Sequence, residues 1–115
     1  MRALITGIGG FVGGHLATLL RQEGAEVWGI DCRPLSGHVA DRGITMLLGD
    51  LCDREFARCA VRDAKPTHVF HLAWEFADNV ARGADADRHN LEGLRLLLEA
   101  VHESAPAARV LVTSS

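Results

Sequence analysis

Short apolar runs alternate along the whole chain with longer segments in which apolar residues recur at helical spacing. The apolar runs are short enough to be buried strands, and they cover residues 2–6, 26–30, 44–48, 67–72 and 109–113. The amphipathic segments predict helices, and they cover residues 11–22, 53–64 and, within a longer stretch, 90–103. Residues 36–43 have no clear pattern and predict a loop or a weak helical turn. Alternation of this kind predicts an α/β fold with a parallel sheet.

The apolar positions also predict which face of each helix is buried. The predicted buried residues are Val12, Leu16, Leu19 and Leu20 in the first helix, Phe56, Cys59, Ala60 and Ala64 in the second, and Leu91, Leu94, Leu98 and Val101 in the third. Asp53 stands where a side chain can cap the second helix. Right-handed crossovers then favour a doubly wound, Rossmann-type sheet of order 3-2-1-4-5, with a ligand crevice between the first and fourth strands. We expect one domain over residues 1–115, truncated after its fifth strand.

A glycine-rich turn joins the first strand to the first helix. Gly7 lets the chain turn sharply, Gly10 leaves room for backbone to approach a pyrophosphate, and Gly13 lets the helix pack closely. The helix that follows begins at Phe11 and Val12, and its free N–H groups and dipole favour phosphate. The alternative is a glycine-rich turn without a ligand. A Walker-type phosphate loop is excluded, because no Gly-Lys-Ser/Thr follows.

Asp31 ends the second strand, twenty-four residues after Gly7. The dinucleotide fingerprint has an acid that binds the adenosine ribose roughly twenty residues after its first glycine. A carboxylate there accepts the ribose hydroxyls and repels a 2′-phosphate, which favours NAD over NADP. Arg33 weakens this preference, because a guanidinium can receive that phosphate.

Charge and composition exclude other kinds of partner. The net charge is −3 and the basic residues never run together, so we expect no nucleic-acid partner. No apolar stretch has the length of a membrane span, and we expect no membrane partner and a cytoplasmic protein. The chain has three cysteines, whose spacing matches no metal signature, and we expect reduced thiols. An acidic group with a histidine falls around a helix start, where acids favour the dipole, so no metal site is predicted: Asp85, Asp87, His89 and Glu92.

Five short segments spread over the chain match the pattern of one family. They are Thr6-Gly7-x-x-Gly10-Phe11-Val12-Gly13-x-His15-Leu16, Gly49-Asp50-Leu51, His71-Leu72-Ala73, Asn90-Leu91-x-Gly93 and Val112-Thr113-Ser114-Ser115. Together they resemble the extended branch of the short-chain dehydrogenase/reductase superfamily, the NAD-dependent sugar-nucleotide epimerases and dehydratases.

The resemblance implies roles for individual residues. It implies that Asp50 and Leu51 contact the adenine and that Ser115, or alternatively Ser114, is the catalytic hydroxyl. The remaining residues implied to line the cofactor are Leu72, Ala73, Trp74 and Asn90, with Trp74 standing where the family commonly has alanine. The family's catalytic Tyr-x-x-x-Lys is missing, because the chain contains no Tyr. We therefore expect further strands and a substrate domain beyond this chain, and no activity from the chain alone.

Three hypotheses stay open on the sequence. The first is the NAD-binding portion of a nucleotide-sugar epimerase or dehydratase. The second is a non-catalytic nucleotide-binding or regulatory module. The third is a fragment that completes its sheet with a partner, since a fifth strand at the edge is unpaired on one side. The sequence leaves the substrate and any homo-oligomer undetermined.

Overall fold

The computed structural model describes residues 1–35, 43–75 and 80–113, and for residues 80–82 it describes the backbone alone. Five strands and three helices alternate within these residues, in the order β1(Arg2–Thr6), α1(Phe11–Gln22), β2(Glu26–Asp31), β3(Thr45–Leu48), α2(Arg54–Ala64), β4(His68–His71), α3(Val80–Ser104) and β5(Arg109–Val112). Each predicted strand lies within two residues of its expected bounds. The third helix begins ten residues earlier than the clear part of its pattern.

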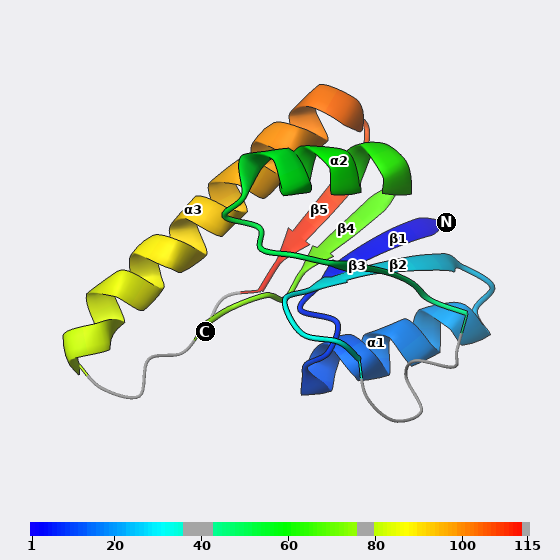
Figure 1. Ribbon diagram of the computed structural model, residues 1–115. Coiled ribbons are helices and arrows are strands. Elements are labelled where there is room, and N and C mark those ends of the chain that lie inside the picture. The colour runs from blue at the N-terminus through cyan, green and yellow to red at the C-terminus, as the bar shows by residue number, and fades with distance from the viewer. Residues whose placement is uncertain (36–42, 76–79, 114–115) are drawn as a thin grey trace.

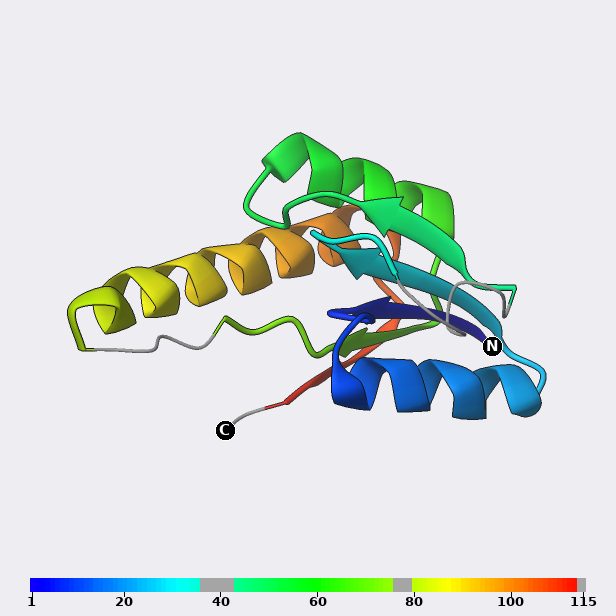
Figure 2. The ribbon, with the colours of Figure 1, turned by 60° about the horizontal axis from the view of Figure 1, so that its bottom comes forward.

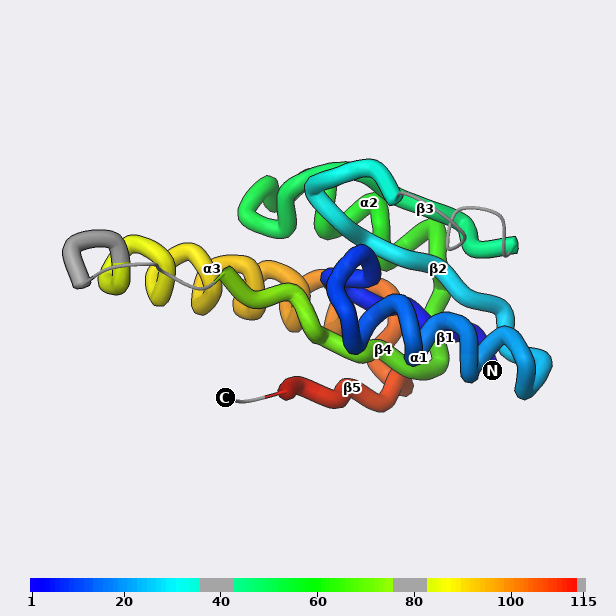
Figure 3. The backbone as a smooth tube through the Cα atoms, turned by 90° about the horizontal axis from the view of Figure 1, so that it is seen from below, coloured from blue at the N-terminus to red at the C-terminus, as the bar shows by residue number. Residues whose placement is uncertain are grey.

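The strands form one parallel sheet in the order β3-β2-β1-β4-β5, which confirms the predicted doubly wound topology. Strands β3 and β5 lie at opposite edges of this sheet (Figure 3). Helix α1 covers one face, whereas α2 and α3 cover the other (Figure 1, Figure 2). The N-terminal half of α3 extends past the carboxyl ends of the strands (Figure 1). That end of the sheet therefore has a wall on the α3 side.

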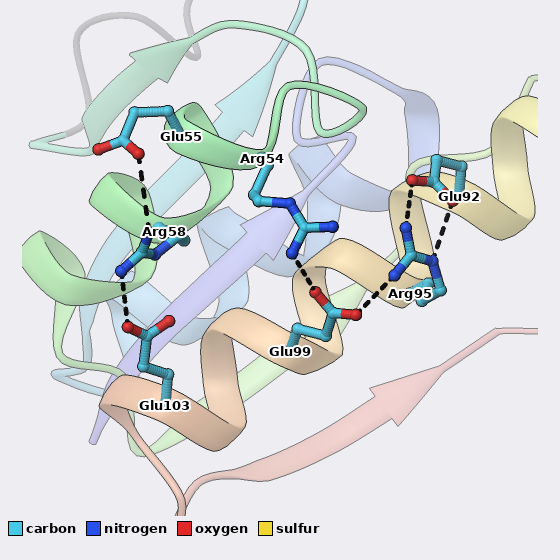
Figure 4. A network of polar contacts seen from close by, with 7 residues as sticks. All are labelled: Arg54, Glu55, Arg58, Glu92, Arg95, Glu99 and Glu103. Atoms are coloured by element: carbon cyan, nitrogen blue, oxygen red, sulfur yellow. Dashed lines mark hydrogen bonds and ion pairs between the residues drawn. The ribbon is translucent and has the colours of Figure 1, made fainter.

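Two apolar cores hold the layers together because strand side chains alternate between the faces. Leu4 of β1 packs with Val61 of α2 and Leu97 of α3, while its neighbour Ile5 packs with Ala17 and Leu20 of α1. Seven charged residues link α2 to α3, or neighbouring turns of one helix, along the outer surface of this helix pair (Figure 4). The inter-helix pairs are Arg54 with Glu99 at 2.9 Å and Arg58 with Glu103 at 2.8 Å.

The predicted buried faces of α1 and α3 were partly wrong. Val12 and Leu19 are 60% and 53% exposed, whereas Leu20 is buried as predicted, together with Gly13 and Ala17. In α3, Leu91 and Leu98 are 61% and 42% exposed. The residues of α3 that form the core are Leu96, Leu97, Ala100 and Val101. Both helices thus place small side chains among the buried ones, where a count of large apolar residues alone misleads.

Helix α2 begins and ends as its sequence indicates. The Asp53 side chain accepts hydrogen bonds from the backbone N–H groups of Glu55 and Phe56 at 3.1 and 3.3 Å, which confirms the predicted cap. Lys65 ends the helix in the left-handed region with φ 46°, ahead of Pro66. Among the described residues, no helix combines the length and the apolar character needed to cross a bilayer.

Candidate functional site

A cleft of about 790 Å³ opens at the carboxyl ends of the central strands. Its walls come from the glycine turn after β1 and from the segments that follow β2, β3 and β4, with His89, Asn90 and Gly93 of α3 closing one side. The first and fourth strands are neighbours in the sheet, and the order of winding reverses between them. This is the place where doubly wound sheets bind ligands.

The glycine turn packs so closely that a side chain does not fit at several of its glycines. Gly7 has φ 71°, and a Cβ on it would lie 2.8 Å from the backbone of Ala73. A Cβ on Gly13 would lie 2.5 Å from the Gly7 carbonyl oxygen, so this glycine lets α1 pack against the turn itself. Gly9 was missed in the sequence, and a Cβ there would lie 2.8 Å from Asp31 Oδ2.

Helix α1 presents an uncapped N-terminus to the cleft. Gly10 lines the cleft and is the N-cap, but it has no side chain to cap with, and the first turn contains no acidic residue. The N–H groups of a first helical turn have no partner within the helix, and they carry the positive end of its dipole. The side chains of Phe11 and Val12 are exposed outside the cleft lining and Gly13 lies behind the turn, so these three can contribute only backbone.

Asp31 ties the glycine turn to the end of β2. Its Oδ2 accepts the Gly9 N–H at 2.8 Å, and its Oδ1 accepts the Arg33 N–H at 3.1 Å. A carboxylate has about four acceptor sites, so two backbone bonds leave capacity for a ligand. The Arg33 side chain is exposed at the same edge of the cleft. The structure thus brings Asp31 together with Gly7 and Gly10 in one wall of the cleft, whereas Gly13 lies outside the lining.

The segments after β3 and β4 form the opposite walls. Asp50 is exposed, and its Oδ1 accepts the Cys52 N–H at 2.9 Å, while Leu51 is 8% exposed and belongs both to the cleft and to the core. Leu72, Ala73 and Trp74 line the cleft as predicted from the resemblance. Their role in holding a ligand stays a prediction.

A single hydroxyl group organises the end of β4. Thr6 Oγ1 accepts the N–H groups of Leu72 and Ala73, both at 3.2 Å, and lies 2.7 Å from His71 Nδ1. The two accepted N–H groups fit a hydroxyl that donates to Nδ1, and in that tautomer the His71 hydrogen is on Nε2. Nε2 is buried and has no partner among the described residues. Burial also lowers the pKa of His71 from its usual 6.5.

Asn90 lines the cleft, and its amide also binds the backbone of Glu75; its contact with the cofactor stays a prediction. Its Oδ1 accepts the Glu75 N–H at 2.7 Å and its Nδ2 donates to the Glu75 carbonyl at 2.8 Å. Because both ends of the amide are engaged, Asn90 holds the segment after β4 against α3. The sequence reasoning also missed three neighbours in the lining, Cys52, Glu75 and His89, because nothing in their spacing links them.

The two residues predicted to supply a catalytic hydroxyl, Ser115 and its alternative Ser114, lie outside the described residues. The last described residue, Thr113, follows β5, and its N–H donates to the carbonyl of His71 at 3.4 Å.

Comparison with known proteins identifies the family. Residues 3–115 match the NAD dependent epimerase/dehydratase family. The chain is 36% identical to a D-erythronate dehydrogenase of Cupriavidus necator, covering 100% of this chain and 39% of that protein. It is 32% identical to UDP-glucuronate 4-epimerase 1 of Arabidopsis thaliana, covering 97% of this chain and 29% of that protein.

Among solved structures, the Thermus thermophilus UDP-glucose 4-epimerase complex with NAD superposes with a TM-score of 0.80 at 33% identity, covering 90% of this chain and 34% of that one. The chain therefore spans about a third of the length of the relatives it matches. The match over nearly every residue and the shared sheet order lead to one conclusion: the chain belongs to the NAD-dependent epimerase/dehydratase family.

Proposed function

We propose that the cleft binds NAD and that the chain is the NAD-binding portion of an epimerase- or dehydratase-like oxidoreductase. One observation carries the proposal. The uncapped N-terminus of α1 and the carboxylate of Asp31 lie on the same wall of a cleft that opens where the winding of the sheet reverses. A diphosphate needs the first of these features and a ribose needs the second.

The residues present fit a dinucleotide. The N–H groups at the start of α1 suit the pyrophosphate, where the glycines leave room for backbone contact. Asp31 retains acceptor capacity for the two ribose hydroxyls, and its charge disfavours the extra phosphate of NADP. Asp50 and Leu51 would contact the adenine, and Leu72, Ala73 and Trp74 would line the rest of the cofactor.

Bound NAD supplies a hydride acceptor, but the chain lacks the acid/base that the resemblance implies, because it contains no Tyr. We therefore infer that these 115 residues bind cofactor without catalysing a reaction, with Ser115 or Ser114 as the only member of the catalytic set that the chain could supply. The relatives include a dehydrogenase and an epimerase that are named for a sugar acid and a UDP-sugar. For the whole protein, we propose a nucleotide-sugar as the class of substrate. We also propose that the protein is located in the cytoplasm.

Titration with NADH tests this proposal. We expect NADH fluorescence to rise on binding, with NAD competing more strongly than NADP. Asp31→Asn should weaken NAD and bring the NAD and NADP affinities closer together, since the variant loses the charge that repels the 2′-phosphate. Asp63→Asn is the matched control, because Asp63 is an exposed residue of α2 outside the cleft lining.

Absence of NADH binding by folded protein at millimolar cofactor would remove the proposal. A preference for NADP would reverse the cofactor assignment and transfer the ribose end of the site to Arg33. Equal effects of Asp31→Asn and Asp63→Asn would show that the cleft wall does not recognise the ribose.

A further inference from the structure

Four side chains with metal-ligating atoms meet at the edge of the cleft that is formed by α3. Asp50 and Cys52 come from the segment between β3 and α2, Glu75 follows β4, and His89 belongs to α3. One ligand atom each from Asp50, Cys52 and His89 lies within 4.8 Å of the others. Three separate elements thus converge on this cluster of Asp50, Cys52, Glu75 and His89.

The distances from one nitrogen to the other three groups are close to those of a metal centre. His89 Nε2 lies 3.7 Å from Asp50 Oδ1, 3.8 Å from Cys52 Sγ and 4.0 Å from Glu75 Oε2. In a tetrahedral zinc site, bond lengths of 2.0–2.3 Å put neighbouring ligand atoms roughly 3.3–3.6 Å apart. The observed separations are longer than these. Asp50, Cys52 and His89 have ligand atoms that all lie within 4.8 Å of one another, so they form the centre of the cluster, and Glu75 would have to move inward to join them.

The local charge also favours a cation. Asp50 and Glu75 form no ion pair with Arg or Lys among the described residues, and both carboxylates lie near the His89 ring. The side chains of Asp50, Glu75 and His89 are 56%, 49% and 46% exposed, so an ion can reach them from solution. The nearby acids Asp50, Glu92 and Glu75, together with burial, raise the pKa of the Cys52 thiol. Such an excess of negative charge is relieved by a bound divalent ion.

We propose that, while the adenine end of the cleft is empty, Asp50, Cys52 and His89, with Glu75 beside them, form a binding site for Zn²⁺ or a chemically similar transition-metal ion; Asp50 is also the proposed adenine contact, so the ion and NAD would compete. A thiolate, an imidazole and carboxylates are the donor set that suits zinc, whereas Mg²⁺ prefers an all-oxygen octahedron. Binding forms an Sγ–metal bond and breaks the Sγ–H bond, releasing one proton to solvent without any change of oxidation state. The thiol hydrogen that is lost is the one donated to the His89 carbonyl at 3.3 Å.

Cobalt reports on this site directly, because Co²⁺ bound to a thiolate has a charge-transfer absorption that Co²⁺ in water lacks. Titrating the chain with Co²⁺ in the absence of nucleotide should produce this band, and Zn²⁺ should abolish it by displacement while Mg²⁺ should not. Binding should strengthen as pH rises, since the thiol proton must leave. The measurement involves no cofactor, so its failure is separate from a failure of NAD to bind.

Cys52→Ser should remove the band, and Cys59→Ser should leave it intact. Cys59 is the matched control, a second half-buried cysteine whose sulfur contacts Glu55 and Arg62 instead. His89→Gln should weaken the affinity by at least roughly tenfold, the loss that even an outer-shell partner causes. If circular dichroism shows that Cys52→Ser is unfolded, the affinity of His89→Gln for Co²⁺ tests the site in its place.

Three results would each overturn the site: no band at excess Co²⁺, a band that survives in folded Cys52→Ser, or a band lost equally in Cys59→Ser. Unchanged affinity in His89→Gln would do the same.

Discussion

At the scale of single residues, the Thr6 hydroxyl is the most heavily used polar group near the cleft. Thr6 is fully buried, and its hydroxyl oxygen accepts the Ala73 N–H. The Leu72 N–H is shared between this oxygen and the carbonyl oxygen of Thr6, and the hydroxyl also lies 2.7 Å from His71 Nδ1. From the sequence, Thr6 was identified only as the first residue of the glycine-turn motif, with no role of its own. Its three bonds reach residues 65 to 67 positions away, so no local pattern could reveal them.

Replacing this hydroxyl by a methyl group gives a sharp test. Thr6→Val should lower the free energy of unfolding by about 1–3 kcal/mol, because the Ala73 N–H and His71 Nδ1 lose their partner inside the protein. Thr6→Ser retains the oxygen and should stay much closer to the parent in urea unfolding. If the serine variant is destabilised as much as the valine variant, the hydroxyl alone does not account for the role of Thr6, and its methyl group contributes as much.

At the scale of elements, the starts of α1 and α2 were predicted closely, whereas the start of α3 and the buried faces of α1 and α3 were not. Asp53 caps α2 through a local contact, and the printed sequence contains all that this requires. The rotation of α1, in contrast, follows from the tight approach of Gly13 to Gly7, which buries Ala17 and exposes Leu19. Close backbone contacts of this kind arise only once the strand and the turn are in place. The pattern of large apolar residues therefore predicted where the helices lie in the sequence, but it predicted the buried face of α1 only in part.

Two of the helical glycines, Gly13 and Gly83, allow the effect of packing to be separated from that of helix propensity. Gly13→Ala should lower the free energy of unfolding by roughly 1–3 kcal/mol, since the new Cβ would lie 2.5 Å from the Gly7 carbonyl and 2.8 Å from Ile8 Cα.

Gly83→Ala is the control in α3, where a Cβ meets nothing within 4 Å. It should instead stabilise by about 0.5–1 kcal/mol, as alanine does in an open helical position. Thermal and urea unfolding of both variants provide the measurement. A neutral Gly13→Ala would mean that α1 can shift away from the turn, contrary to the packing described above.

At the scale of the whole molecule, strand order and the position of the cleft followed from the alternation of elements, and the structure confirms the order. The residues that line the cleft were predicted only in part. Asp31 and the glycines follow from the dinucleotide fingerprint, whereas Cys52, Glu75 and His89 belong to three different segments of the chain that come together only in the fold. Such meetings depend on where α3 crosses the ends of the strands. Motifs describe single connections and carry no information about that crossing.

Stability of the whole fold should depend on pH through His71. Its pKa is lowered in the folded state by burial, so between the folded and unfolded pKa values the unfolded chain binds more protons. The contribution is complete above the unfolded value of about 6.5 and is lost as pH falls below it toward the folded value. Urea unfolding from pH 8 to pH 5 should show this loss in the parent.

His71→Gln should flatten that part of the pH profile, because the variant has no titrating group at this position. The exposed His102 of α3 provides the control, and His102→Gln should keep the parent slope. Equal slopes in the parent and in His71→Gln would assign the pH dependence to another group.

The double hydrogen bond between the Asn90 amide and the Glu75 backbone couples the far side of the cleft to a helix of 25 residues. Any tilt of α3 about its packed C-terminal half must carry Glu75 with it. Changes in side-chain volume around Leu97, well inside the core, would then widen or narrow the entrance while every wall residue stays the same. We therefore expect the width of the cleft to depend on how α3 packs as well as on the residues that line the cleft.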